Sequence, residues 1–196
     1  MKSAKTRQFI IESTASIFNI KGYSGTSLAD LTEATKLTKG SIYGNFANKE
    51  EVALAAFDYN YNHVKSKIIA ELKNCNTYTE KLLVYAKVYN QSEKNFPKGG
   101  CPLLNTAIEA DDMHEALRKK VADCITVWKK DIVTIITKGI LAEEFKQGTN
   151  AENIALTIIA LIEGGIMISK VSKNRTYFDI IINQVENLII SIQTKK

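Results

Sequence analysis

The stretch from Leu37 to Glu51 limits the possible folds of this chain more than any other part of the sequence. Two helix-start signals lie close together within it. Thr38 is one candidate N-cap, and Asn48 is another, with Glu51 three positions later in capping-box spacing. We therefore expect a short helix after Thr38, a tight turn, and a longer helix after Asn48. The stretch reads Leu-Thr-Lys-Gly-Ser-Ile-Tyr-Gly-Asn-Phe-Ala-Asn-Lys-Glu-Glu.

The residues before this stretch predict two further helices. Residues 3–20 carry one apolar stripe at helical spacing, and Gly22 is available for a left-handed C-cap. Ser27, or alternatively Thr26, can cap a second, short helix, with Asp30 as the capping-box partner. Two short helices that are joined by a tight turn and packed on a preceding helix form a helix-turn-helix.

Positive charge is concentrated in the first quarter of the chain. Residues 1–49 hold seven Lys/Arg against three Asp/Glu, a net charge of +4 out of a total of +5. A basic head on a near-neutral body is expected of a DNA-binding segment, although charge alone fits a solvated surface better. In the helix after Thr38, we expect Ile42 and Phe46 to face the core, which leaves polar and basic side chains facing outward.

The remaining three quarters of the chain read as long helices. Only two prolines and ten glycines occur in 196 residues, which disfavours turn-rich β folds. Helical periodicity predicts an all-α fold of about nine helices. We expect a helix-turn-helix domain over residues 1–47 and a larger helical domain over residues 48–196. The later helices are expected at about 48–73, 78–95, 103–110, 113–145, 151–172 and 175–194.

The last two expected helices are apolar on more than one face, which exceeds what a single core-facing stripe needs. The simplest interpretation is a subunit interface in which two helices from each of two chains form a four-helix bundle. Complete burial inside a monomer is the alternative. The predicted interface residues are Ile158, Leu161, Ile162, Gly164, Gly165, Ile168, Ile181, Val185, Leu188, Ile189 and Ile192.

The sequence has no pattern for catalysis, metal binding or export. Its three cysteines are widely spaced and its two histidines lie far apart. There is no CxxC pair, no nucleophile–base pair and no glycine-rich phosphate loop. We therefore expect no enzyme activity, no cofactor and no metal. No signal peptide is evident, and the apolar window at 154–168 is shorter than a membrane span of about 20 residues. A cytoplasmic protein without a membrane partner is expected.

The helix pattern and its residues resemble the TetR family of one-component transcriptional regulators. The resemblance is specific over the first quarter of the chain, where order, spacing and residue types agree, and the rest matches in helical layout. One departure is Lys36, which stands where the inter-helix turn of this family often has glycine. The matching segments are Gly22-Tyr23, Thr26 to Leu31, Thr38 to Phe46 and Asn48 to Glu51. In addition, Gly100 to Ala107 resembles a stretch of one subgroup.

The resemblance implies that the third helix enters the major groove of an operator. A homodimer would place two copies about one helical turn apart on a pseudopalindrome. Repression is the usual sign of regulation in the family, with activation as the alternative. The residues expected at the bases are Thr38, Lys39, Gly40, Ser41, Tyr43 and Asn45. Those expected at phosphates are Thr26, Ser27, Tyr43 and Lys49, and for Tyr43 a core position is the alternative.

Members of this family also bind a small organic effector among their middle helices. The candidate pocket residues are Phe57, Tyr61, Tyr85, Tyr89, Asn105, Glu109, Trp128 and Met167, with ordinary core packing as the alternative for each. Cys101 precedes an expected helix start, where the pKa of a thiol is lowered, so thiol-based electrophile or redox sensing is an alternative to ligand release. A buried, inert Cys101 competes with that interpretation. A helical dimeric interaction protein without DNA binding is a further alternative. A DNA affinity that falls steeply with salt would distinguish a DNA-binding regulator from such a protein.

Overall fold

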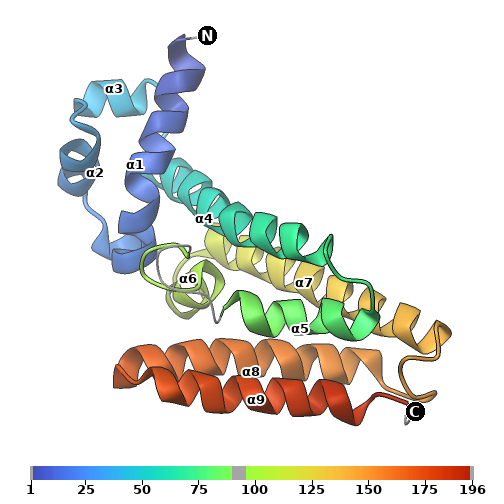
Figure 1. Cartoon of the computed structure of the whole chain (residues 1–196). Helices are drawn as coiled ribbons and strands as arrows, with labels where there is room; N and C mark the ends of the chain where they lie inside the picture. The colour runs from blue at the N-terminus through green and yellow to red at the C-terminus, as the bar shows by residue number, and fades with distance from the viewer. Residues whose placement is uncertain (1, 90–95, 195–196) are drawn as a thin grey trace. The chain divides into compact units, whose positions relative to one another are not determined.

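The computed structural model describes residues 2–89 and 96–194, and in these ranges the regular structure is α-helical (Figure 1). An isolated antiparallel bridge joins Phe145 and Gln193. The all-α prediction is therefore confirmed. The helices are α1 (Lys2–Gly25), α2 (Leu28–Thr35), α3 (Lys39–Tyr43), α4 (Lys49–Leu72), α5 (Tyr78–Val88), α6 (Pro102–Ala110), α7 (Glu115–Leu141), α8 (Ala151–Ser172) and α9 (Arg175–Ser191).

The described residues form two compact units. The first unit draws on Met1–Lys65 and Phe96–Val121, and the second on Ser66–Asn95 and Ala122–Lys196. By its contacts, α6 thus belongs with α1, α2, α3 and the first part of α4, although it lies far from them in the sequence. The functional boundary that we expect between residues 47 and 48 stays a prediction, because compactness does not test it.

In the first unit, α1, α2 and α3 pack around a small apolar core (Figure 1). The expected capping box forms at the start of α2. The Ser27 hydroxyl accepts the Asp30 N–H at 3.1 Å, and the Asp30 carboxylate accepts the Ser27 N–H at 2.8 Å. A hydrogen bond from Lys21 and the bonds from Ser27 hold the pKa of Asp30 well below its usual value. The core residues are Ile10, Ala15, Phe18, Leu31, Ile42, Phe46, Val52, Ala53 and Ala56.

Lys36 closes the turn between α2 and α3 in a left-handed conformation, with φ 56° and ψ 20°. An L-residue pays a steric cost there that glycine avoids. We therefore expect Lys36→Gly to raise the free energy of unfolding by about 1 kcal/mol. Urea unfolding followed by circular dichroism measures this value. Lys36→Ala is the control, because alanine keeps the Cβ and should give no gain. Equal stabilities of the two variants would contradict this account of the turn.

In the second unit, α8 and α9 lie side by side (Figure 1) and bury Ile158 and Ile162 of α8 against Val185 and Ile189 of α9. Helix α5 also contacts α9. The expected extension of α7 to about residue 145 is wrong, because α7 ends at Leu141. The chain turns there so that the Phe145 ring packs on Gly139, where any Cβ would lie 2.2 Å from the ring.

One other expectation needs correction. Helix α5 ends at Val88 rather than at about residue 95, and residues 90–95 lie outside the described residues. A capping box from Thr77 and Glu80 starts α5, and the Glu144 carboxylate accepts the N–H groups of Tyr78 and Thr79 at 3.0 and 3.1 Å.

Candidate nucleic-acid interface

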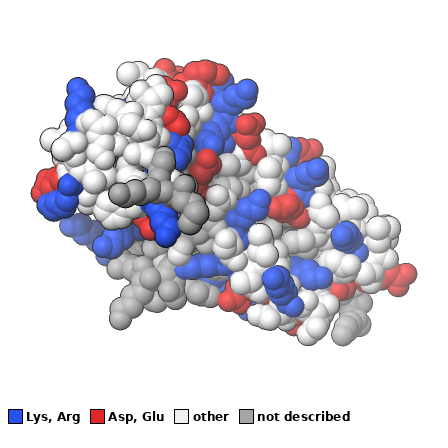
Figure 2. Space-filling model, turned by 90° about the horizontal axis from the view of Figure 1, so that it is seen from above, with Lys and Arg blue, Asp and Glu red and all other residues white. Residues whose placement is uncertain are grey.

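Charge is mixed on the molecular face that Figure 2 shows. Lysine and arginine side chains alternate there with aspartate and glutamate, and no broad region of this face carries one sign. On this face, therefore, charge does not mark a binding surface. The geometry of α3 has to locate that surface instead.

Two buried side chains anchor α3. Ile42 is fully buried and Phe46 is 2% exposed, as the apolar spacing predicted. The Thr38 hydroxyl accepts the Ser41 N–H at 3.2 Å, which confirms Thr38 as the N-cap. With the inner face held by these anchors, the first turn of the helix is left at the surface. Thr38, Lys39 and Gly40 are exposed there.

The later residues of this helix are less accessible than its first turn. Ser41, Tyr43 and Asn45 are half-buried. Tyr43 packs against the apolar core of the first unit, so it is neither a pure surface residue nor a pure core residue. The Asn45 amide donates to the Ser41 carbonyl at 2.9 Å, which uses one of its donors within the helix.

Thr26 and Ser27, both expected at phosphates, differ in their surroundings. Thr26 is 1% exposed, and its hydroxyl donates to the Gly22 carbonyl at 2.6 Å. In this conformation the Thr26 hydroxyl is buried and its hydrogen is already donated, so the structure lends no support to a phosphate contact of this side chain, which stays a prediction. Ser27 is exposed, although its hydroxyl takes part in the α2 capping box.

Lys49 has a structural role that its sequence position does not suggest. Its ammonium donates to the carbonyl oxygens of Tyr23 at 2.8 Å and Thr26 at 3.0 Å, and it lies 4.1 Å from the centre of the Tyr23 ring. Two of its three N–H groups are thus used to tie the start of α4 to the segment between α1 and α2. A phosphate contact would have to use the third N–H, and it stays a prediction.

Arg7 is a residue that the sequence pattern missed. Its guanidinium donates to the Asn45 carbonyl at 2.6 Å and to the Glu51 carboxylate at 2.8 Å, and it lies 3.9 Å from the centre of the Phe46 ring. Two hydrogen bonds lower the pKa of the Glu51 carboxyl. The bond from the Ala47 N–H has the larger effect, and the bond from Arg7 adds to it. Asn48 does cap α4, accepting the Glu51 N–H at 2.9 Å. Arg7 therefore fixes the C-terminal side of the short helix α3 to α1.

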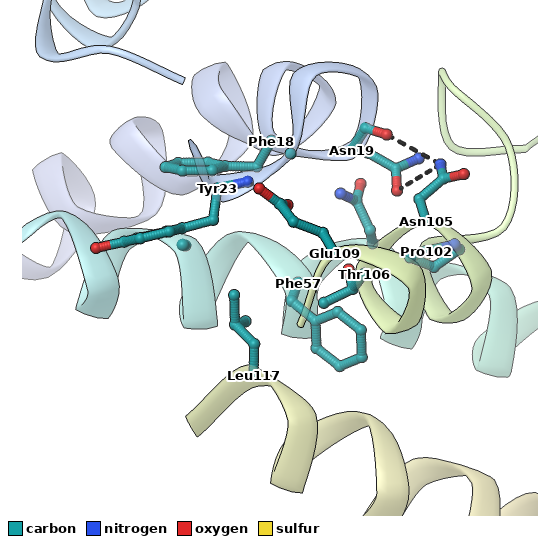
Figure 3. Close-up of a pocket in the computed structure, with 12 residues that line it drawn as sticks. Phe18, Asn19, Tyr23, Phe57, Pro102, Asn105, Thr106, Glu109 and Leu117 are labelled. Atoms are coloured by element: carbon teal, nitrogen blue, oxygen red, sulfur yellow. Dashed lines mark hydrogen bonds between the residues drawn. The ribbon is translucent and has the colours of Figure 1, made fainter. Parts of the chain in front are cut away.

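A break at Gly22 joins the N-terminal helices to α6. Gly22 has φ 72° and ψ 179°, a combination that is essentially restricted to glycine and differs from the left-handed helical cap we expected. The break exposes the next two N–H groups, and the Glu109 carboxylate accepts both, from Tyr23 and Ser24, each at 2.6 Å (Figure 3). The Tyr23 ring also meets His114 edge-on, with centroids 4.5 Å apart.

A cavity lies beside this contact, within the first unit (Figure 3). Its empty volume, which includes space open to solvent, is about 350 Å³. Three predicted pocket residues, Phe57, Asn105 and Glu109, line it, and Tyr61 stacks on Phe57 at 6.0 Å. The complete lining is Phe18, Asn19, Gly22, Tyr23, Ala53, Phe57, Asn60, Pro102, Asn105, Thr106, Glu109 and Leu117.

Asn105 and Glu109 connect α6 to α1 rather than standing free in the cavity. The Asn105 amide donates to the carbonyls of Asn19 and Gly99, each at 2.9 Å. The Asn19 amide in turn donates to the carbonyls of Lys98 and Gly100 at 2.8 and 3.0 Å. The polar wall of this cavity is therefore largely satisfied by the protein itself.

The other predicted pocket residues lie in the second unit. Tyr85, Tyr89 and Trp128 are buried together, with ring centroids 6.4 Å and 6.0 Å from Trp128. Met167 is 43% exposed on α8, and its place in an effector pocket stays a prediction.

Cys101 lies at the N-cap of α6, at the helix start that the sequence predicted. Its side chain is only 1% exposed. Reactive cysteines are normally accessible as well as electrostatically activated. This conformation therefore does not favour a direct thiol sensor at Cys101.

The predicted subunit interface divides into two groups. Ile158, Ile162, Gly165, Val185, Ile189 and Ile192 are buried within the single chain, so they do not lie on its surface, and their place at a subunit interface stays a prediction. Leu161, Gly164, Ile181 and Leu188 are half-buried, and Ile168 is 42% exposed.

Exposed apolar residues on α8 and α9 form stripes that the sequence only partly revealed. On α8, Leu156, Ala160, Gly164 and Ile168 recur every four residues, and a Cβ added at Gly164 would meet nothing within 4 Å. Val171 continues this stripe with 80% exposure. On α9, Tyr177 and Ile180 are 43% and 54% exposed. Each helix thus has a second apolar face besides the one that packs in the core.

Among the described helices, α8 alone is long and apolar enough to cross a membrane. It has a mean hydropathy of 1.9, and 28% of the relevant window is buried in the chain. Length and composition do not separate a membrane span from a soluble helix with an apolar partner. The pairing of α8 with α9 favours the second explanation.

Comparison with known proteins gives two family matches. Residues 10–56 match the model described as bacterial regulatory proteins, tetR family, and residues 79–185 match the tetracyclin repressor-like C-terminal domain. A TetR-family regulator of Cytophaga hutchinsonii has 60% sequence identity and a TM-score of 0.97, with 100% of this chain and 98% of the other covered.

Two further proteins extend the comparison. The repressor DhaR of Mycobacterium sp. strain GP1 is 23% identical over 181 residues, covering 91% of this chain and 89% of DhaR. A cysteine variant of the regulator CifR, solved with 26-base-pair operator DNA, has a TM-score of 0.80 and 20% identity, covering 94% and 95% of the two chains. At that identity, the CifR match shows a shared fold.

Proposed function

Because this chain belongs to the TetR family of helix-turn-helix transcriptional regulators, we propose that it is a cytoplasmic repressor that binds a pseudopalindromic operator as a homodimer. Members of this family are DNA-binding regulators rather than enzymes. We further propose that a small organic effector releases the operator. The observation that carries the proposal is α3, held from inside by Ile42 and Phe46 with its first turn exposed.

The shape of α3 suits entry into a major groove. Its exposed first turn carries short side chains and Lys39, so the backbone can come close to the DNA, and Gly40 adds no side chain to prevent this. Base-edge contacts give sequence choice, whereas phosphate contacts give affinity and salt dependence. We assign Lys39 and Asn45 to base reading, and Ser27, Tyr43 and Lys49 to phosphates. CifR, which shares the fold, was solved with operator DNA, which supports DNA binding by a protein of this fold.

A second copy of the chain is the partner we propose for the exposed stripes of α8 and α9. Helix-turn-helix proteins reach two half-sites one helical turn apart by dimerising. An exposed apolar stripe marks an interaction surface when it is contiguous along a helix. The stripe of Leu156, Ala160, Gly164 and Ile168 meets that description, and the small residues within it allow close helix approach.

The salt dependence of DNA binding tests the proposal. Operator fragments are first selected from genomic DNA with the purified protein, and affinity is then measured by fluorescence anisotropy at several salt concentrations. We expect Lys39→Ala to weaken operator binding by about tenfold or more. If Lys39 also contacts a phosphate, the slope of log affinity against log salt concentration should fall by about 2 per dimer.

Lys130→Ala is the matched control, since Lys130 is an exposed lysine on α7. We expect it to leave the affinity unchanged. Wild-type affinity in the combined Lys39→Ala and Tyr43→Ala variant, with folding intact by circular dichroism, would contradict the docking of α3. Absence of any salt-sensitive DNA binding would favour a helical interaction protein instead.

A further inference from the structure

Arg7 of α1 contacts the end of α3 and the start of α4 at the same time. Its guanidinium donates to the Asn45 carbonyl at 2.6 Å and to the Glu51 carboxylate at 2.8 Å, and it lies 3.9 Å from the centre of the Phe46 ring. A guanidinium can make all three contacts because its N–H groups point outward in one plane and leave both flat faces free for stacking. All four residues belong to the first compact unit.

Glu51 is the acidic partner in this contact. One of its carboxylate oxygens accepts an N–H of Arg7, and the other accepts the Ala47 N–H at 2.6 Å. The Glu51 N–H itself donates to the Asn48 side chain at 2.9 Å. The turn between α3 and α4 is thus held by the side chains of Arg7 and Glu51, which are also bonded to each other.

Helix α3 needs a directional contact of this kind. It has only five residues, and an isolated helix shorter than about 12 residues is marginal in water. The buried Ile42 and Phe46 attach its inner face, but apolar contacts are non-directional and leave its rotation less closely defined. Hydrogen bonds weaken as their angle departs from linearity, so the bonds of Arg7 resist such a rotation. A binding site works only when its groups are held to within about 0.5 Å of the productive geometry, and this applies to groups that read base edges.

The same contact adds little to the stability of the fold. The side chains of Arg7 and Glu51 are 37% and 40% exposed. Ion pairs that water reaches to this extent are screened, and the entropy lost in ordering two long side chains offsets much of their attraction. The orientation of α3 is therefore the property that this pair affects most.

We propose that Arg7 is a positioning residue for operator recognition. Bonded to Glu51, it holds α3 at the angle at which the outer face of the helix meets the base edges, and it does so without contacting DNA. Two of its guanidinium nitrogens are already bonded to the protein. Base contacts give sequence choice, so losing Arg7 reduces the preference for the operator over unrelated DNA. This inference rests on the proposed DNA-binding function and adds to it a residue outside the reading helix.

Binding of the full-length protein to two DNA duplexes tests the proposal. One duplex carries the operator selected from genomic DNA, and the other has the same length and base composition in scrambled order. Fluorescence anisotropy gives both affinities at several salt concentrations, and the readout is their ratio. We expect Arg7→Met to lower this ratio by about tenfold or more, as when a base contact is misaligned in each half-site. The slope of log affinity against log salt concentration should stay unchanged, because the phosphate contacts remain.

Arg7→Lys distinguishes the geometry of the side chain from its charge. A lysine ammonium keeps the charge but has no planar fork of donors, so we expect the same loss of preference as in Arg7→Met. Arg118→Met is the matched control. Arg118 also pairs with a carboxylate, that of Glu115, and is 48% exposed, but this pair lies within α7. The control should keep the wild-type ratio of affinities.

Glu51→Gln tests the partner of Arg7. The ratio of affinities is the proper readout for this variant, because removing a carboxylate strengthens binding to any DNA. If the two residues act through one contact, the double variant Arg7→Met with Glu51→Gln should have a ratio no lower than that of Arg7→Met alone. Losses that multiply in the double variant would contradict the shared contact.

Circular dichroism and thermal melts establish that the variants fold, and Arg7→Gln replaces Arg7→Met if that variant does not. A wild-type ratio in the folded Arg7 variants, or in Arg7→Lys alone, would overturn the positioning role. An equal loss on both duplexes, with a salt slope reduced by about 2 per dimer, would also overturn it, since Arg7 would then contact a phosphate.

The wild-type protein separates this inference from the proposed function. If the wild type prefers its operator but the Arg7 variants keep that preference, the regulator assignment stands and the positioning role fails. A wild type that binds both duplexes equally, or neither of them, would contradict the regulator assignment itself, and the positioning role would fail with it.

Discussion

Replacing Ile168 by glutamate is expected to convert the proposed dimer into monomers and to weaken operator binding by about 100-fold or more. Ile168 belongs to the exposed apolar stripe of α8 and is 42% exposed in the single chain. A carboxylate buried at a subunit interface without a partner is strongly unfavourable. A monomer presents one copy of α3 to the DNA, so it loses the gain from holding two half-sites at once.

Analytical ultracentrifugation measures the association state of this variant, and fluorescence anisotropy measures its affinity for the operator. Leu141→Glu is the matched control, since Leu141 is an apolar residue that is 79% exposed at the end of α7, outside the stripe. We expect that control to remain dimeric and to bind DNA normally. A dimeric Ile168→Glu protein at micromolar concentration would rule out this face as the interface.

The second large effect is expected at Gly22, where Gly22→Ala should lower the free energy of unfolding by about 3 kcal/mol. Two causes act together. Gly22 has φ 72°, which L-residues rarely adopt, and a Cβ there would lie 2.3 Å from a Glu109 carboxylate oxygen. Moving Glu109 away would also remove its hydrogen bonds to the N–H groups of Tyr23 and Ser24. Urea unfolding gives the change in free energy.

Gly25→Ala is the control for this prediction, because a Cβ at Gly25 would meet its nearest neighbour at an ordinary 3.5 Å. We expect it to change stability by less than about 1 kcal/mol. The double variant Gly22→Ala with Glu109→Ala relieves the clash but not the backbone strain, so it should stay less stable than Glu109→Ala alone. If the urea midpoint of unfolding is the same for Gly22→Ala and the wild type, the break at Gly22 does not constrain the fold.

Local sequence signals predicted the helix starts well, for a physical reason. The Ser27–Asp30 box and the Thr38 and Asn48 caps are hydrogen bonds between residues three apart, so the chain needs no tertiary contact to form them. The inward positions of Ile42 and Phe46 followed from helical spacing in the same way. Lys36 has a positive φ at the position where the inter-helix turn of the TetR family often has glycine, but the sequence alone did not predict that conformation.

Contacts between distant residues were not predictable in this way. Glu109 reaches Tyr23 across 86 positions and Arg7 reaches Glu51 across 44, and no local pattern pairs these residues. Lys49 was expected at a phosphate because it lies on the first turn of a helix, yet two backbone carbonyls take its ammonium. Hydrogen-bond donors look the same in a sequence whether their acceptor is DNA or the protein itself.

The apolar content of α8 and α9 shows the same division. Composition, periodicity and capping are local properties, so they were enough to predict a helical chain, a capped short helix, and two last helices with more apolar residues than one core needs. The assignment to a family of regulators came from the resemblance of its motifs to that family. Which apolar face of α8 and α9 is left over follows only from the tertiary packing. Ile158, Ile162, Val185 and Ile189 turned inward, whereas Leu156, Ile168 and Val171 stayed exposed. The rotation of a helix about its own axis depends on the neighbours it packs against, and those neighbours come from distant parts of the chain.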